Sequence, residues 1–310
     1  MNRIVRNRYR AGMLLMLLWL LSCLGTQAQQ KVQVVTRTLE QRWIGKPNML
    51  VRIQAEKATL RVQGWDKPTV EVVLRLSARH PDRAVAERDL AAAQYRLQEN
   101  ASAINLINFF SLPSGAPTVQ SDLRAEYTVM MPASNPLQAA NTYGQTTLAG
   151  LNGEQKLEQN FGQISLRDLR GSLSATIRYA DLVATNVHAD FICEANKSAV
   201  QLLGLGGSCF VRNYYGSIQV QPAAELRKLT VEADRTKVII SAAEPALFAY
   251  QLNVLQGQLV VPPAYAAAKK GAASRASLTT KPASGTQPLV RASTSYSSLI
   301  LQTQLLSTQF

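Results

Sequence analysis

The sequence predicts an all-β protein built as a parallel β-solenoid, a single-stranded β-helix of about 18 residues per coil, with an N-terminal β-rich cap that carries one α-helix. Two observations predict it: a side-chain pattern that recurs every 18 residues, and short runs of alternating apolar and polar residues bounded by Gly, Asn and Asp. The 310 residues are 46% hydrophobic and 17% charged, as in an ordinary globular protein. A mostly disordered or collagen-like chain is therefore excluded.

The N-terminus, residues 1–28, is expected to be a secretory signal peptide. A basic segment at Arg3–Arg10 precedes an apolar stretch at 11–24, and small side chains favour cleavage after Ala28. The apolar run is shorter than the ~20 residues of a spanning helix, which favours cleavage over a retained membrane anchor. Lipidation at Cys23, which follows a partial lipobox, is a third possibility. The mature chain, with no transmembrane span expected, should be exported to the periplasm, the cell surface or the medium.

Residues 29–140 are predicted to form the β-rich cap. The segments 51–54, 60–63 and 70–76 alternate as strands do. A proline at the first helical position and an Ala-rich continuation predict one α-helix near residues 81–97. An open solenoid end would pair with other chains, so we expect the cap to cover it.

The repeat occupies residues 141–262. The segments that begin at Tyr143, Phe161 and Tyr179 start 18 residues apart, and the segment at Tyr215 follows after twice that step. Strands this short do not close a sheet alone, so stacking of successive coils about 4.8 Å apart is expected to bury their apolar side chains in continuous ladders. A β-sandwich of hairpins is the alternative, but hairpins would not require a pattern that recurs in register.

The same four aromatic residues, Tyr143, Phe161, Tyr179 and Tyr215, are the candidate binding residues. Facing outward, they would form a stacked strip suited to sugar rings or another apolar surface. Each lies beside a small residue that lets backbones pack closely. We therefore expect them to face inward as an ordinary core ladder.

The C-terminal part is predicted to be a flexible basic loop, residues 263–288, followed by a final coil and the C-terminus, residues 289–310. The loop is poor in large apolar residues and rich in Ala, Ser, Thr, Lys and Gly, whereas Tyr296 restores the coil pattern. The protein carries a formal charge of +13, and cations of this loop could hold anionic glycans, lipid head groups or nucleic acid by charge alone. The basic loop residues are Lys269, Lys270, Arg275 and Lys281.

Metal and cofactor chemistry are not expected. Only three Cys and two His occur, too few for a zinc site with all-protein Cys and His ligands once Cys23 is removed with the signal peptide. Cys193 and Cys209 could form one disulfide after export, but both lie in apolar strand segments, which slightly favours free buried thiols.

An enzyme of β-helix type, a polysaccharide lyase or hydrolase, is the alternative function. It would need two carboxylates ~5 to 9.5 Å apart across a substrate. The candidate acids fall at different phases of the repeat, so solvated turn residues explain them more simply. These acids are Asp168, Asp181, Asp190 and Glu194.

The chain resembles a family of bacterial secreted proteins of unknown function, described as adhesin-like or as autotransporter-adhesin head domains. The resemblance is carried by Leu60–Trp65, by Val129–Pro132 and by the Tyr-Gly and Phe-Gly coils at 143, 161 and 215, over roughly residues 50–303. It implies a β-solenoid of the cell envelope and supplies no catalytic residue. The prediction is thus an exported, non-enzymatic scaffold or adhesion and ligand-binding module, with glycans or envelope polymers as partners and no specific nucleic acid. The oligomeric state is left open.

Overall fold

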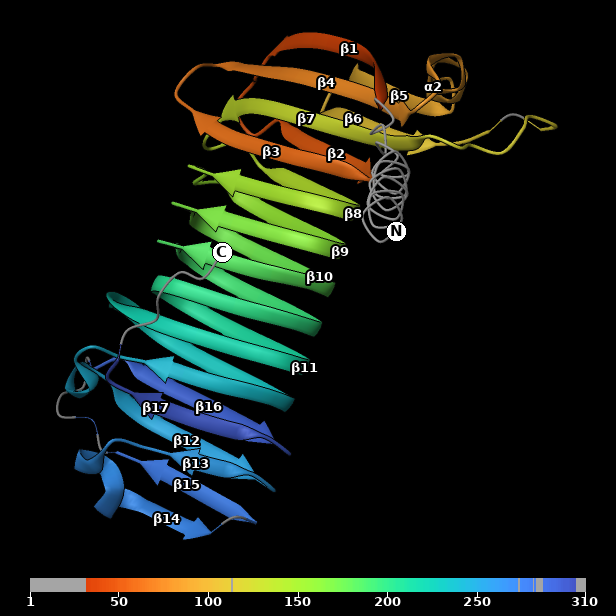
Figure 1. Cartoon of the computed structure of the whole chain (residues 1–310). Helices are drawn as coiled ribbons and strands as arrows, with labels where there is room; N and C mark the ends of the chain where they lie inside the picture. Colours follow the sequence, from red (N-terminus) through yellow and green to blue (C-terminus); the bar gives the residue numbers. More distant parts are fainter. Residues whose placement is uncertain (1–31, 113, 273, 281, 283–286, 305–310) are drawn as a thin grey trace, which may run out of the picture.

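The computed structural model describes residues 32–112, 114–272, 274–280, 282 and 287–304. These residues form an all-β protein in which 17 strands join one mixed sheet, stacked along the length of the molecule (Figure 1). The expected signal peptide and Cys23 lie outside the described residues. No helix in the described part of the chain has the length and apolar character needed to cross a membrane.

The strands, in chain order, are β1 (Gln33–Ile44), β2 (Leu50–Glu56), β3 (Ala58–Trp65), β4 (Thr69–His80), β5 (Ala93–Glu99), β6 (Ala103–Phe110), β7 (Asp122–Pro132), β8 (Leu137–Ala149), β9 (Glu154–Arg167), β10 (Arg170–Thr185), β11 (His188–Ser241), β12 (Ala249–Leu255), β13 (Gln258–Val260), β14 (Lys269–Ala272), β15 (Arg275–Thr279), β16 (Leu289–Ser295) and β17 (Ser298–Gln302). The helical segments are α2 (Arg83–Leu90), η1 (Pro245–Leu247) and η2 (Pro263–Ala268).

The middle of the chain has the register that the sequence repeat predicts. Leu137 pairs with Gln155, Gln155 with Leu173, and Leu173 with Phe191, all in parallel strands and each 18 residues from the last. Apolar side chains at the same step are buried, for example Leu148, Leu166, Ala184 and Leu202. Burial of these columns explains why the register is fixed, since a slip by one residue would expose all of them.

The sheet is not wholly parallel, and the predicted boundary at residue 140 does not mark the start of the stack. β2 and β3 pair in parallel with β8, and β6 and β7 add to them in parallel. The antiparallel pairs β1–β4, β4–β7 and β5–β6 then complete this end. The expectation of a parallel sheet is thus wrong at the ends, where antiparallel strands cover the last parallel edge.

The helix expected near residues 81–97 is only half that length. α2 begins after Asp82, whose carboxylate accepts a hydrogen bond of 2.8 Å from the Ala84 N–H, and ends at Leu90. From Ala93 the chain forms β5, which pairs along its whole length with β6. Strand pairing here outweighs the helix propensity of the Ala-rich sequence.

The C-terminal region also departs from the prediction. Residues 263–288, expected to be a flexible loop, contain η2, β14 and β15, and β15 pairs in antiparallel fashion with β12. The final segment does pair with the stack, but not at its end. Val290 of β16 pairs in parallel with Leu229 of β11 on one side and with Tyr250 of β12 on the other. Residues 289–302 are therefore inserted between two segments that precede them in the chain.

Candidate functional site

The four aromatic candidates lie on the outside of the molecule. The exposed fractions of Tyr143, Phe161, Tyr179 and Tyr215 are 54%, 39%, 49% and 41%. The rings of Tyr143 and Phe161 stack with centroids 4.8 Å apart at 9°, and those of Phe161 and Tyr179 with centroids 5.1 Å apart at 10°. The expectation that these rings face inward is wrong.

Backbone conformation explains the outward direction. Tyr143, Phe161, Tyr179 and Tyr215 have φ values of 61°, 60°, 54° and 59°, in the left-handed region. The parallel pairing is interrupted at these positions, because the chain turns a corner there between two strand segments. A side chain on the outer side of such a corner points to solvent.

The small residue after each ring serves the neighbouring backbone and not the ring. A Cβ on Gly162 would lie 1.8 Å from the carbonyl oxygen of Gly144, and a Cβ on Gly216 would lie 2.1 Å from that of Ser198. Only glycine fits such a close approach of two backbones. The small neighbours thus favour close stacking of the corners, with the aromatic side chain outside.

The row of corner residues is longer than the sequence repeat indicates. Lys197 lies with its Nζ 5.0 Å from the Tyr179 ring centroid, and the Arg235 guanidinium lies 5.3 Å from the centroids of both Tyr215 and Tyr296. We name this row the corner ladder. In spatial order it comprises Phe110, Lys57, Tyr143, Phe161, Tyr179, Lys197, Tyr215, Arg235, Tyr296 and Gln256.

Backbone geometry supports the added members. The Lys57 N–H donates to the Thr142 carbonyl oxygen at 2.7 Å, which places Lys57 beside Tyr143. The Lys57 Nζ also lies 5.7 Å from the Phe110 ring centroid. Lys57, Lys197 and Arg235 share the positive φ of the aromatic corners. Positive φ at a non-glycine residue is the common property of this row.

The ring faces of the ladder are occupied by its own members. Phe161 lies between two rings, the second face of Tyr179 meets Lys197, and Arg235 lies between Tyr215 and Tyr296. The solvent therefore meets ring edges, tyrosine hydroxyls and cationic groups. Flat stacking of a sugar ring on the inner rings is blocked, whereas hydrogen bonding and charge pairing are available.

Buried amides hold the corners from inside. The side chain of Gln159 donates to the carbonyl oxygens of Phe161 at 2.9 Å and Gly144 at 3.2 Å, and Asn213 donates to Ser198 at 2.9 Å. Gln159 is 1% exposed and Asn213 is fully buried. These bonds satisfy carbonyl groups at the corners, where the strand ladder is interrupted, and so fix the direction of the outer side chains.

A row of polar side chains borders the corner ladder. The residues two and four positions after each corner line a shallow depression of about 690 Å³. Gln145, Gln163, Ser217 and Gln219 contribute amides and hydroxyls, and the Gln145 amide lies 3.5 Å from that of Gln163. Asp181 is the acid among the residues that line it, and its carboxylate accepts from the Ala199 N–H at 3.0 Å. This surface can offer many uncharged hydrogen-bonding groups.

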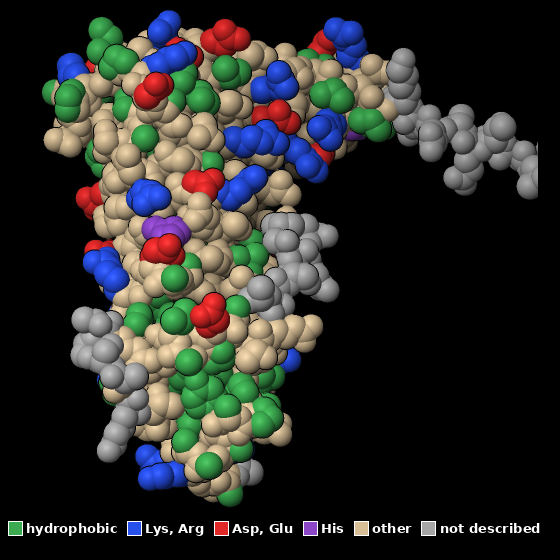
Figure 2. All heavy atoms as spheres, turned by 90° about the vertical axis from the view of Figure 1, so that its left-hand side faces the viewer, with side chains coloured by type: hydrophobic (Ala, Val, Ile, Leu, Met, Phe, Trp, Pro, Cys, Tyr) green, Lys and Arg blue, Asp and Glu red, His purple; other side chains and the backbone are tan. Residues whose placement is uncertain are grey.

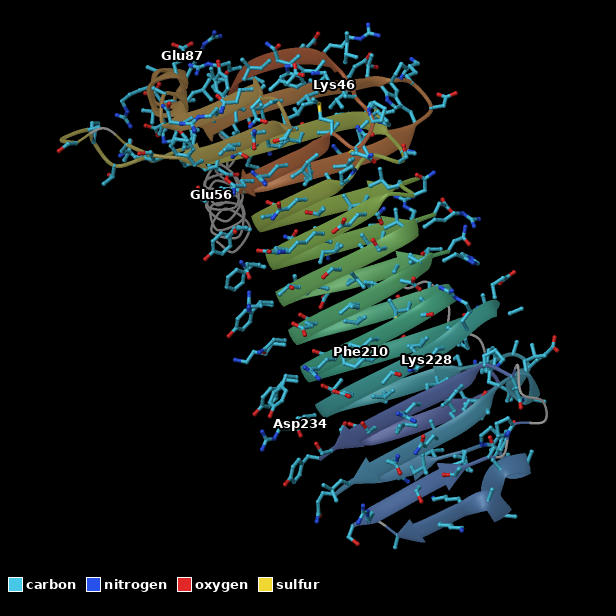
Figure 3. All side chains as sticks on the ribbon, turned by 180° about the vertical axis from the view of Figure 1, so that it is seen from behind. Lys46, Glu56, Glu87, Phe210, Lys228 and Asp234 are labelled. Atoms are coloured by element: carbon cyan, nitrogen blue, oxygen red, sulfur yellow. The ribbon has the colours of Figure 1, made fainter. Side chains whose placement is uncertain are left out.

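Figure 3 shows the row of side chains that projects along one edge of the stack, with Glu56 and Asp234 close to it. A second corner, on the other edge, also has positive φ, at Gly150, Asp168, Asn186 and Gly204. The side turned away from the ladder carries Lys and Arg together with Asp and Glu, with no continuous row of one kind (Figure 2). A continuous aromatic and cationic surface is thus a feature of the first corner.

The basic residues of the predicted loop are only partly related to the ladder. Lys269 and Lys270 lie in β14 and Arg275 in β15, whereas Lys281 lies outside the described residues. Lys269 donates to the Leu259 carbonyl oxygen at 2.8 Å. It also lines a depression of about 720 Å³ together with Gln256 and Tyr296 of the ladder.

The candidate acids are not brought together. Asp190 pairs with Arg227 at 2.6 Å, Asp168 accepts from Asn186 at the second corner, and Asp181 lies on the other strand layer beside the ladder. Glu194 is exposed on β11. Among the described residues, no three His, Cys, Asp or Glu side chains are placed to hold a metal ion. The enzyme alternative therefore gains no assembled pair of carboxylates from these acids.

Cys193 and Cys209 are both buried and free. Burial, with a smaller contribution from the charge of Glu194, raises the pKa of the Cys193 thiol to about 12. Burial also raises the pKa of Cys209 well above its ordinary value. Both thiols are therefore held in the neutral, unreactive form.

No protein-family model and no curated protein matches the chain. Among solved structures, it is similar to a proposed cell adhesion protein from Clostridium sporogenes, at 8% identity and a TM-score of 0.26 over 86% of this chain and 99% of that one. It is also similar to a proposed adhesin from Bacteroides fragilis, at 10% identity and a TM-score of 0.31 over 87% of this chain and 97% of that one. TM-scores this low carry no argument about function.

Proposed function

We propose that this chain is an exported, non-enzymatic β-solenoid that acts as a cell-envelope scaffold or adhesion module and binds an extended polymer along the corner ladder. The observation that carries the proposal is the unbroken exposed row of aromatic and cationic side chains at ten successive corners. Glycans or other envelope polymers are the proposed partners, as the sequence already led us to expect.

The shape of the surface supports an extended ligand. Ten rungs at the spacing of neighbouring strands, about 4.8 Å, give a row on the order of 40 Å long. Sites for small molecules are usually concave pockets that bury most of the ligand. A straight, exposed row bordered by a shallow depression instead suits a linear chain that makes one similar contact at each rung.

The rigidity of the row also supports binding. The ladder side chains are held by their neighbours, and the corners are held by the buried amides of Asn141, Gln159 and Asn213. A surface that is ordered before it binds loses little conformational entropy on binding. Weak contacts repeated along such a row can add to a useful affinity.

A polymer-binding screen tests the proposal. The exported protein would be applied to immobilised peptidoglycan, teichoic polymers and neutral and acidic polysaccharides, and bound protein would be quantified. The double variant Gln145→Ala/Gln163→Ala removes two exposed amides beside the ladder. The matched control, Gln41→Ala/Gln98→Ala, removes two exposed amides at the N-terminal end.

We expect at least one polymer to bind, with affinity reduced in the first variant and unchanged in the control. Loss of affinity in both variants, or binding of no polymer, would contradict the proposal. Release of shortened products during the incubation would favour the enzyme alternative instead.

A further inference from the structure

We infer that the corner ladder binds an acidic polysaccharide, with charged groups on alternate sugar residues facing Lys57, Lys197 and Arg235. This inference rests on the proposed function, because it names the chemical class of the polymer bound there. It is carried by the charge of the ladder, by the spacing of its cations and by the occupation of its ring faces.

The corner ladder carries only positive charge. Three of its ten members are Lys or Arg and none is Asp or Glu. The ion pairs of the described residues leave Lys57 and Lys197 without a carboxylate partner. Arg235 has a loose pair of 3.9 Å with Asp234. All three cations are exposed, so their charge is directed to solvent.

The residues that flank the row do not cancel this charge. Asp234 accepts a hydrogen bond from the Ser295 hydroxyl, and Glu56 accepts from the Phe110 N–H at 3.2 Å. Arg178, exposed and next to Tyr179 in the chain, adds a further cation. The row and its flanks together remain positive, which favours an anionic ligand.

The spacing of the cations follows an even number of rungs. Tyr215 alone separates Lys197 from Arg235, which places them two rungs or about 10 Å apart. Three aromatic rungs separate Lys57 from Lys197, which places them four rungs or about 19 Å apart. An extended polysaccharide advances by roughly one rung per sugar residue. A carboxylate or sulfate on every second sugar would therefore meet each cation in turn.

The occupied ring faces favour a polysaccharide over single-stranded nucleic acid. Proteins that bind single strands without sequence preference stack bases on free aromatic faces. Phe161, Tyr179 and Tyr215 have no such role available, because their faces meet other ladder members. Their edges and hydroxyls instead suit the C–H and hydroxyl groups of sugars.

The ladder leads at its C-terminal end into the depression that Tyr296 and Gln256 share with Lys269. Lys269 is exposed and extends the line of positive charge beyond the last ring. A chain longer than the ladder would therefore continue toward a further cation.

The test uses hyaluronan, which has a carboxylate on every second sugar, and its neutral methyl ester, which has the same backbone. The triple variant Lys57→Gln/Lys197→Gln/Arg235→Gln removes the ladder cations. The matched control, Arg37→Gln/Arg79→Gln/Lys228→Gln, removes three exposed cations elsewhere and has the same net charge. A charge-preserving variant, Lys57→Arg/Lys197→Arg/Arg235→Lys, shows whether side-chain shape alone matters. Thermal unfolding checks that each variant is folded.

We expect hyaluronan to bind the wild-type protein with an affinity that falls as salt rises, and its methyl ester to bind about tenfold more weakly, since three exposed charge pairs contribute about 1.4 kcal/mol in total. The ladder variant should lose about the same factor. The control and the charge-preserving variant should change affinity less than about twofold, well below the factor expected for the pairs.

Equal binding of hyaluronan and its ester would overturn this inference and leave the proposed function intact. Binding of a neutral polymer alone in the wider screen would do the same. Tighter binding of poly(dT) than of hyaluronan would assign the ladder to nucleic acid. Binding of no polymer in either experiment would overturn both proposals.

Discussion

Arg235 contacts Tyr215 in two ways: its Nη1 donates to the tyrosine hydroxyl at 2.7 Å, and its guanidinium carbon lies 5.3 Å from the ring centroid. The two residues are 20 positions apart, whereas the earlier ladder members are 18 apart. The corner therefore keeps its contact when the length of the repeat changes. The extra residues are accommodated elsewhere in the turn, and the outer row continues.

The stacked rings are expected to stabilise the corners. Phe161→Ala removes two ring contacts and should lower the free energy of unfolding by about 1 to 3 kcal/mol, at about 0.5 to 1.5 kcal/mol for each pair. Phe161→Gly should lose less, because glycine relieves the left-handed conformation at φ 60°, which costs about 1 kcal/mol. Urea denaturation measures both. An alanine variant as stable as the wild type would show that stacking contributes nothing.

Close approach of the corner backbones is expected to make Gly162 irreplaceable. Gly162→Ala places a Cβ 1.8 Å from a carbonyl oxygen, so the protein should be destabilised by more than about 3 kcal/mol or fail to fold. Gly115→Ala is the control, since Gly115 also has positive φ, at 80°, but no atom lies within 4 Å of the added Cβ. It should cost only about 1 kcal/mol. Thermal unfolding compares the two, and similar melting temperatures would contradict the explanation.

The buried carboxylate of Asp89 is expected to control stability in acid. Burial opposes its ionisation, but hydrogen bonds from Arg88, from the Gln120 and Ser121 N–H groups and from the Ser121 hydroxyl outweigh burial and lower its pKa to about 2. The pKa is thus depressed on folding. The corresponding stability, about 2 kcal/mol, is present above pH 4 and is lost as the pH falls toward 2.

Asp89→Asn tests this role. The variant should be less stable than the wild type at pH 7 by about 2 kcal/mol, and the difference should shrink between about pH 5 and pH 2. Asp66→Asn, at an exposed position, is the control and should show no such trend. Denaturant unfolding across this pH range measures it, and a constant difference between wild type and Asp89→Asn would rule the explanation out.

The two buried thiols are expected to resist alkylation. Since burial raises the pKa of Cys193 to about 12 and that of Cys209 well above its ordinary value, iodoacetamide at pH 8 should leave the native protein unmodified. Both thiols should react in denaturant without a reductant. Mass spectrometry counts the adducts, and a requirement for reductant would reveal a disulfide between them.

The register of the stack could be predicted from the sequence because residue types repeat with it. Tyr143, Phe161 and Tyr179 are spaced as the parallel strands are. The direction of their side chains could not be predicted in the same way. A small residue after the ring is needed whether the ring faces in or out, since Gly162 makes room for the backbone of Gly144 in either case.

The full extent of the corner ladder could not be predicted because strand pairing brings distant segments together. Lys57 joins Tyr143 across 86 residues, and Arg235 joins Tyr296 across 61. No repeat unit in the sequence links these positions. Alternation of aromatic and cationic residues along the ladder is visible only after β2 and β16 are placed in the stack.

The position of β16 and β17 has a consequence for biogenesis. A polypeptide that emerges from its N-terminus can pair β8 to β11 in order, but the place between β11 and β12 is filled only when residues 289–302 appear. Folding of this end therefore awaits late synthesis and translocation. A product cut before Leu289 would leave β11 and β12 with unpaired backbone groups, a template for aggregation, and quality-control proteases would find an incomplete molecule by that edge.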